Sequence, residues 1–243
     1  MDNTNNSCCC GETEHFSGCL ICGAPVTYSV ESSVKTCSIC HKEQLTNTVC
    51  ENGHFVCDAC HSYGTYAPVI TTLRDSTEKD ALLLLEKIMD LPSVHMHGPE
   101  HHAIVPCVLL TAFRNNGEHM DYDAALSEIC KRAKQVPGGT CGYWGVCGAA
   151  AGAGIFMSVM TGSSPLHKDA WPFPQKLVSI ILSRLADVGG PRCCKRTSRI
   201  AIEEAVHFYS QFCSVNIPLS SITCKYCEDN RECIQEDCPY YSE

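Results

Sequence analysis

The chain has 243 residues, 44% of them hydrophobic, which is enough to bury a substantial core in one or two domains. Its net charge of −9 excludes a basic footprint spread over the whole chain, although a local basic patch stays open. Cysteine is the outlier, with 21 residues, and the polar start MDNTNNSCCC lacks the apolar segment of a secretory signal. Many cysteines form C-x-x-C pairs, which in such a chain indicate metal ligands in a reducing cytoplasm rather than disulfides.

A zinc-binding module is predicted over residues 19–65, after a polar and disordered tail over residues 1–18 that includes Cys8, Cys9 and Cys10. The module carries eight candidate ligands in four pairs: Cys19/Cys22, Cys37/Cys40, Cys50/His54 and Cys57/Cys60. Two pairs complete one tetrahedral site, so the segment predicts two zinc ions. The order of the pairs resembles a cross-braced RING finger in outline, and two consecutive zinc ribbons fit the spacing as well.

An all-α domain is predicted over residues 70–218, because apolar residues recur there at helical spacing. Helices are expected after Ser76 or Thr77, from Pro99 or Pro106 to about Arg114, after Asp121, after WPFP (171–174) and from Thr197 or Ser198. The uncharged stretch 145–162 reaches the minimum length of a membrane span. Since it consists mainly of glycine and alanine, a buried helix is the favoured interpretation and no membrane contact is expected.

Three glycine-rich turns hold the unusual residues of the helical domain, each beside a predicted helix start. They read HMHGPEHH, with His97, Glu100, His101 and His102; VPGGTCGYWGVCGAA, with Cys141 and Cys147; and GGPRCCKR, with Arg192, Cys193, Cys194 and Lys195. A helix N-terminus attracts anions and lowers the pKa of a thiol. We therefore expect the turns to converge on one site, a hypothesis that fails if they lie on different faces.

Within this site the cysteines of the second and third turns are predicted to bind an iron–sulfur cluster or another metal, with His97 as a metal ligand. Adjacent cysteines seldom bind one ion together, so Cys193 or Cys194 is free to act as a nucleophile or redox partner. The predicted acid–base groups are Glu100, His101 and His102. The predicted binding residues for an anionic substrate or for the cluster are Cys141, Cys147, Arg192 and Lys195.

A second metal-binding segment is predicted in the C-terminal tail, residues 219–243. Its ligands are Cys224, Cys227, Cys233 and Cys238. Zinc and a [4Fe–4S] cluster both fit, because Pro239 after the last cysteine is shared with bacterial ferredoxins whereas the spacing is not. The separate cysteines at positions 107, 130 and 213 lie within predicted helices and are assigned to the core.

The three turns and the stretch CENGHFVCDACHS together resemble a cysteine-rich family from anaerobic archaea and bacteria, classed as a domain of unknown function. The resemblance covers roughly residues 19–240. It implies an anaerobic, metal-rich setting and indicates that the motifs form one unit. It supplies no catalytic roles.

Two functions of different classes follow from these patterns. The first is a metal- or iron–sulfur-dependent enzyme, a sulfur transferase or oxidoreductase, acting on a small anionic or sulfur-containing substrate. The second is a zinc-ribbon adaptor for a protein or RNA partner, although the acidic balance disfavours nucleic acid. Metal storage or sensing is a third interpretation, which the organised helical core fits less well.

Overall fold

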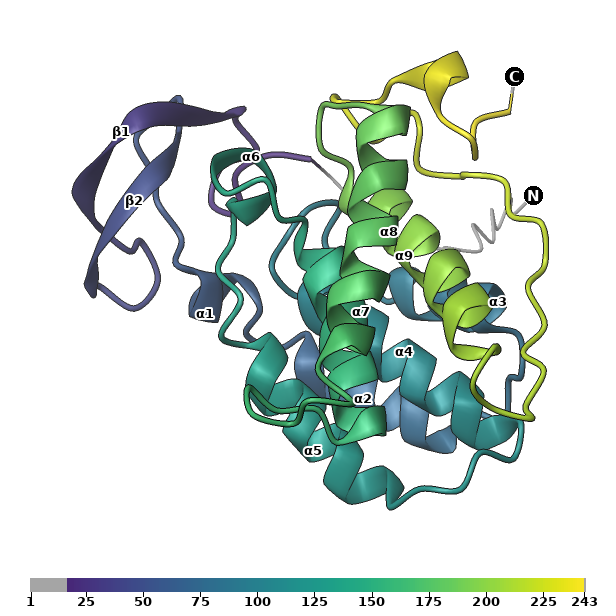
Figure 1. Cartoon of the computed structure of the whole chain (residues 1–243). Helices are drawn as coiled ribbons and strands as arrows, with labels where there is room; N and C mark the ends of the chain where they lie inside the picture. The colour runs from purple at the N-terminus through teal and green to yellow at the C-terminus, as the bar shows by residue number, and fades with distance from the viewer. Residues whose placement is uncertain (1–16, 243) are drawn as a thin grey trace, which may run out of the picture.

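A β-hairpin forms most of the N-terminal module in the computed structural model, which describes residues 17–242. Strands β1 (Val26–Thr36) and β2 (Glu43–Cys50) are antiparallel, with Val26 opposite Cys50 at one end and Thr36 opposite Glu43 at the other. The short helix α1 (Asp58–His61) follows. The three consecutive cysteines of the predicted tail lie outside the described residues. Figure 1 shows the hairpin projecting from one side of the molecule.

The module has a very small hydrophobic core of its own. Its cluster of buried apolar residues, within the described part of the chain, consists of Cys37, Phe55 and Cys57. Three partly buried residues pack around them, and two of these are also cysteines of the ligand pairs. The core thus consists largely of candidate metal ligands, a composition typical of small domains whose folding depends on bound metal.

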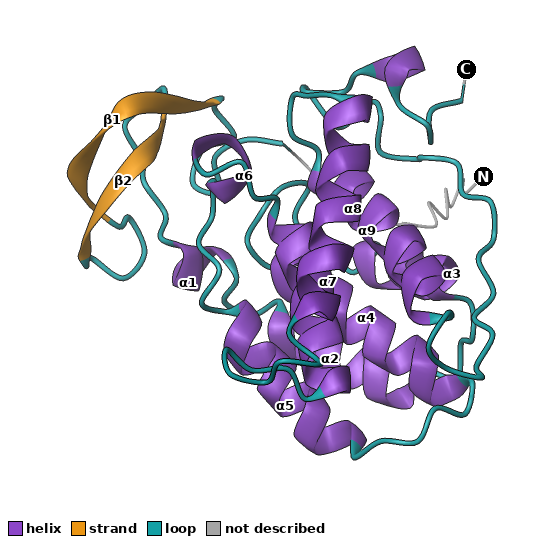
Figure 2. Cartoon of the chain, in the orientation of Figure 1, coloured by secondary structure: helices purple, strands orange, loops and turns teal. Residues whose placement is uncertain are grey.

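Helices make up most of the remaining described chain (Figure 2). They are α2 (Tyr66–Asp75), α3 (Ala81–Met89), α4 (His101–Asn115), α5 (Tyr122–Ala133), α6 (Thr140–Tyr143), α7 (Gly148–Thr161), α8 (Pro172–Val188) and α9 (Cys194–Tyr209). Every residue of α4 from His101 to Phe113 is buried, because α2, α3, α5, α7 and α9 all pack against it. The structure is thus mostly helical, with one small sheet beside the N-terminal cysteine clusters.

The uncharged stretch around residue 150 forms α7, a buried helix in contact with α4. Gly152 of α7 lies so close to the His102 carbonyl and the Pro106 ring that a side chain at residue 152 has no room. Pro106 lies inside α4 and does not begin it, so the helix starts at His101 beyond Pro99. None of the helices within residues 17–242 has the length and apolar character needed to cross a membrane.

Helix starts agree with the predicted caps in one case and differ in two. Asp121 caps α5 as predicted, by accepting a hydrogen bond from the Ala124 amide. Helix α3 begins after Asp80 rather than after Ser76 or Thr77. Helix α9 begins at Cys194, earlier than predicted, because the Cys193 thiol accepts from the Arg196 amide and takes the place of an oxygen cap. Lys195 and Arg196 therefore lie within the helix, and both are buried.

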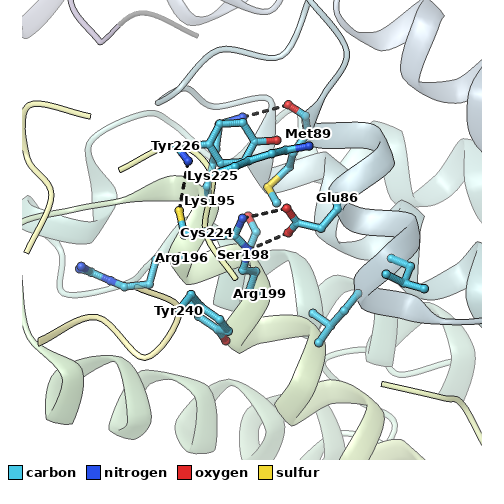
Figure 3. Close-up of polar contacts among 12 residues, drawn as sticks. Glu86, Met89, Lys195, Arg196, Ser198, Arg199, Cys224, Lys225, Tyr226 and Tyr240 are labelled. Carbon is cyan, nitrogen blue, oxygen red and sulfur yellow. Dashed lines mark hydrogen bonds and ion pairs between the residues drawn. The ribbon is translucent and has the colours of Figure 1, made fainter. Parts of the chain in front are cut away.

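The C-terminal tail runs along α3 and α9 with little regular structure apart from the 3₁₀ turn η1 (Gln235–Asp237). Figure 3 shows the tail residues Tyr226 and Tyr240 beside the buried ion pair of Arg199 with Glu86. The Tyr226 hydroxyl donates to Asp90 at 2.5 Å, and the Tyr240 hydroxyl donates to Glu203 at 2.9 Å. The tail is therefore fixed to the helical domain by aromatic side chains.

Candidate functional site

The four ligand pairs of the module form two interleaved groups. Among the described residues, the first and third pairs come together as Cys19, Cys22, Cys50 and His54, and the second and fourth as Cys37, Cys40, Cys57 and Cys60. The hairpin explains this pairing. Its register places the Cys50 end beside the first pair, whereas the Cys37 turn lies at the other end, where the chain returns with the fourth pair. The cross-braced alternative is therefore the one observed.

Distances within both groups are those of a tetrahedral metal site. The Cys22 and Cys50 sulfurs lie 3.9 Å apart, and those of Cys40 and Cys57 lie 3.8 Å apart. The Cys50 sulfur lies 3.5 Å from His54 Nδ1. With Zn–S bonds of 2.3 Å and Zn–N bonds of 2.0–2.1 Å, a tetrahedron has edges of roughly 3.8 and 3.6 Å. Each group can hold a metal ion such as zinc, with all four ligands supplied by the protein.

A cavity of about 910 Å³ lies between the module and the helical domain. Residues of all three glycine-rich turns line it, together with residues of β2 and of the segment 54–61. The module is fixed over the cavity by two hydrogen bonds to the second turn: the Gly138 amide donates to Asp58 at 2.7 Å, and the Tyr143 hydroxyl donates to the Ser29 carbonyl at 2.9 Å. The three turns therefore share one cavity, as the hypothesis of a common site requires.

Four thiols from two of the turns line this cavity: Cys141, Cys147, Cys193 and Cys194. Cys147 is the cap residue of α7, Cys194 is the first residue of α9, and Cys141 lies in α6. Burial raises the pKa of Cys194 to about 12, although the neighbouring Arg192 opposes the shift, so the lowering expected at a helix N-terminus is outweighed by burial. Burial, followed by the nearby Cys147 thiol, also raises the pKa of Cys141. These thiols do not fall within one single-ion group, which is limited to ligand atoms within 4.8 Å of one another among the described residues.

The adjacent cysteines of the third turn have different surroundings. Cys194 is next to Arg192 and Cys147, whereas the buried Cys193 is capped onto the Arg196 amide and has Cys224 of the tail nearby. Burial raises the pKa of Cys193 as well. Both line the cavity, and Cys194 is the one of the two with Arg192 and Cys147 nearby.

Lys195 and Arg192, both predicted to bind an anion, lie in different places. Arg192 lines the cavity and stacks over the Tyr28 ring at 5.1 Å. Lys195 does not line it: its side chain has 0% exposure, donates to the Met89 carbonyl at 2.9 Å and contacts the Tyr226 ring (Figure 3). Burial, and then the nearby Arg199 guanidinium, lower the pKa of Lys195 to about 8. The structure therefore directs this lysine toward the tail and away from the cavity.

His102 has a ring nitrogen without a partner among the hydrogen bonds of the described chain. Its Nδ1 donates to the Val136 carbonyl at 3.0 Å, so in the neutral ring Nε2 carries the lone pair. Burial lowers the pKa of His102 and favours this neutral form. Nε2 lies against Gly148 at the start of α7, where no larger side chain fits. His102 can thus accept a proton or bind a metal from the cavity.

The other two predicted histidines are His101, which contacts residues of the helical domain, and His97, which contacts the tail. His101 is almost fully buried: its Nε2 donates to the His95 carbonyl at 3.0 Å, and its Nδ1 lies 3.4 Å from the Ser198 hydroxyl. Burial lowers its pKa to about 3. His97 Nε2 lies 3.0 Å from the side-chain oxygen of Asn230 and 3.2 Å from Glu232, and so connects the turn to the tail. Neither imidazole belongs to a single-ion group within residues 17–242.

A third ligand group was not anticipated in this combination. It consists of His61, His95 and Glu100. Glu100 has 0% exposure, and although burial opposes its ionisation, hydrogen bonds from His61 and His95 hold its pKa well below the usual range. His95 lies in the first turn and His61 directly follows the zinc-ligand pair that ends at Cys60. The two histidines meet only because the module packs against the helical domain, and no local sequence pattern predicts that packing.

The four tail cysteines do not form a single-ion group in the described structure. All four are partly buried. Cys224 lies next to the Lys195–Arg199 cluster, where its sulfur accepts a weak contact from the Tyr226 amide at 3.5 Å (Figure 3). Their metal binding stays a prediction. Cys107 is buried as expected and lies 3.7 Å from the partly buried Cys130, sulfur to sulfur.

The structure thus combines two interleaved Cys/His clusters, both compatible with metal binding, with a helical domain and a Cys/His-lined cavity. The chain belongs to the Family of unknown function (DUF5714), which matches residues 69–241. The predicted resemblance to a domain of unknown function is thereby confirmed for the helical domain and the tail. The match begins at residue 69 rather than near residue 19, so the module and its CENGHFVCDACHS stretch lie outside it. A search of curated proteins and a search of solved structures gave no match.

Proposed function

We propose that the chain is a metal-dependent enzyme of sulfur-transfer or redox chemistry, whose reaction centre is the cavity between the module and the helical domain. The observation that carries the proposal is that Cys141, Cys147, Cys193 and Cys194 line one cavity together with Arg192. A thiol-rich cavity next to a guanidinium suits a small anionic or sulfur-containing substrate. The reducing conditions that free thiols need favour the cytoplasm of an anaerobic cell.

The module's two groups are assigned to structural zinc. Each supplies four protein ligands at tetrahedral distances, which leaves no open position for a substrate. The two zinc ions would stabilise the fold of the module, which covers the cavity. Catalysis is assigned to the cavity and not to these two ions.

The cavity thiols suit an iron–sulfur cluster better than one zinc ion. Cysteines that bind a [4Fe–4S] cluster each bind a different iron, so they need not lie within the coordination sphere of a single ion. With Cys141, Cys147 and Cys193 as ligands, one iron would stay free for substrate and Cys194 would stay free as a nucleophile. This matches thiols that share the cavity without forming a single-ion group among the described residues.

In sulfur transfer, Cys194 would act as the sulfur carrier. Its thiolate attacks the outer sulfur of a donor persulfide, the S–S bond of the donor breaks, and the donor leaves as a thiolate while Cys194 becomes a persulfide. His102, whose Nε2 lies at the cavity, is the proposed proton acceptor. Arg192 would hold an anionic group of the donor.

Replacing Cys194 by serine is expected to abolish persulfide formation because the carrier sulfur is removed. The test exposes the anaerobically purified chain to a low-molecular-weight persulfide and locates the added sulfur by peptide mass spectrometry. Cys213→Ser is the matched control, since Cys213 is also partly buried but lies outside the cavity lining. Equal labelling of wild type and Cys194→Ser would contradict the carrier role.

An adaptor function is the second candidate, and the surface of the hairpin favours it. The side chains of Val30, Val34 and Leu45 are 96%, 61% and 70% exposed on the two strands. Exposed apolar side chains on a small module are typical of protein-binding sites. A Val30→Ser/Val34→Ser variant, which changes no residue of the cavity lining, separates the two functions: loss of persulfide chemistry would show that the hairpin surface takes part in it, whereas retention supports the cavity as the reaction centre.

A further inference from the structure

We infer that a third metal ion, a divalent transition metal such as Zn²⁺ or Fe²⁺, binds His61, His95 and Glu100 where the module meets the helical domain. This site is separate from the thiol centre proposed above and does not depend on it. His61 comes from α1 of the module, and the other two residues come from the turn before α4. The imidazole rings of His61 and His95 meet edge to face, with centroids 4.6 Å apart.

The distances among the three side chains fit one coordination sphere. His95 Nδ1 lies 2.9 Å from Glu100 Oε1, and His61 Nδ1 lies 3.2 Å from Glu100 Oε2. For metal–ligand bonds of 2.0–2.2 Å, neighbouring ligand atoms at octahedral or tetrahedral angles are roughly 2.8–3.6 Å apart. Two histidines with one carboxylate are an established donor set for zinc and for non-haem iron.

The negative charge of Glu100 is buried and would be stabilised by a bound cation. Its carboxylate has 0% exposure, and its ion-pair partners within residues 17–242 are the two histidines alone. A buried carboxylate is costly unless it is paired or binds a metal. Two neutral imidazoles donate hydrogen bonds but leave the negative charge in place, whereas a divalent ion between the three side chains neutralises it.

The turn is built to hold these ligands. The His95 amide donates to Glu100 Oε1 at 3.2 Å, and His101 Nε2 donates to the His95 carbonyl, so the backbone of His95 is fixed on both sides. At Gly98 a side chain would occupy the position of the Glu100 carboxylate. Glycine at this position therefore lets the carboxylate fold back toward the histidines. His101 and Gly98 act as positioning residues for the site.

The site is open toward the cavity, in contrast to the closed groups of the module. The side chains of His61 and His95 are 19% and 27% exposed, and both line the cavity. Three protein ligands leave at least one coordination position for water or for substrate. The ion would also join the two parts of the chain, because His61 directly follows the module's ligand Cys60.

Cobalt(II) binding tests this inference on the full-length chain. A weak chelator removes metal from the open site and spares the closed cysteine sites, and Co²⁺ is then titrated under anaerobic conditions. We expect wild type to bind one further equivalent with visible d–d bands and without thiolate-to-cobalt charge transfer, since no cysteine is a ligand. Glu100→Gln and His61→Asn should each weaken this binding by 10-fold or more.

Two controls keep the test specific. His119→Asn changes an exposed histidine outside the cavity lining, and Cys194→Ser removes the proposed sulfur carrier; both should bind cobalt like wild type. Because His61 is partly exposed, the His61→Asn variant removes one ligand while the buried Glu100 stays unchanged. Absence of cobalt binding in wild type, unchanged binding in both ligand variants, or a thiolate charge-transfer band would overturn the inference.

Discussion

Replacement of Cys57 by serine is expected to release metal from the module and to unfold residues 19–62, while the helical domain keeps its structure. Cys57 is a buried ligand of the second cysteine group and one of the few core residues of the module. Binding of structural zinc contributes about 10 kcal/mol or more to the folding of small zinc domains. With so small a core, the module has no other interaction of that size.

Zinc release with a colorimetric chelator and limited proteolysis together measure this effect. Cys57→Ser should contain about one zinc ion fewer per chain and should be cleaved within residues 19–62, while its far-ultraviolet circular dichroism stays helical. Cys213→Ser, which changes a cysteine outside both groups, should behave like wild type. A protease-resistant module with unchanged zinc in Cys57→Ser would show that the four cysteines do not hold a structural ion.

Replacement of Glu86 by glutamine is expected to lower the free energy of unfolding of the helical domain by about 3–5 kcal/mol. The Arg199 guanidinium has 0% exposure and is paired by two hydrogen bonds to the Glu86 carboxylate, at 2.7 and 2.9 Å. Removing the negative charge leaves Arg199 buried and unpaired, with the buried cation of Lys195 nearby. The loss should also loosen the tail, since Tyr226 and Tyr240 lie against the guanidinium.

The matched control is Glu128→Gln on α5. Glu128 pairs with Arg132 four residues later, and both side chains are 37% exposed. A surface pair of this kind is worth about 0.3–0.5 kcal/mol, so the control should unfold in urea almost like wild type. If the free energy of unfolding of Glu86→Gln differs from that of wild type by no more than that of the control, the Arg199–Glu86 pair does not stabilise the helical domain.

The sequence alone predicted local chemistry well and long-range pairing poorly. Closely spaced pairs such as Cys37/Cys40 identify metal ligands because both members lie on one turn, and the short Asp121 cap is equally local. Which pairs share an ion depends on the register of a hairpin, and spacing leaves that open. In the same way, His61 and His95 meet only after the module docks onto the helical domain.

Helix α9 shows a second limit of pattern-based prediction. Lys195 was predicted to bind an anionic substrate or the cluster, yet it is fully buried under the tail, as is Arg199. Ile202 and Tyr209 of this helix are buried, whereas Phe212, beyond the end of the helix, is 53% exposed. Buried cations depend on partners from distant segments, here Glu86 and Tyr226, so a periodicity of apolar residues carries no sign of them.

The central claim is that the cavity between the module and the helical domain holds a reactive metal centre in addition to the two structural ions. Its most direct test is a count of zinc, iron and acid-labile sulfide per chain in protein purified without oxygen, together with the visible spectrum. The account predicts about two zinc ions for the two module groups, and further metal, including iron with sulfide, in the cavity. Two zinc ions with no other metal and no sulfide would contradict it.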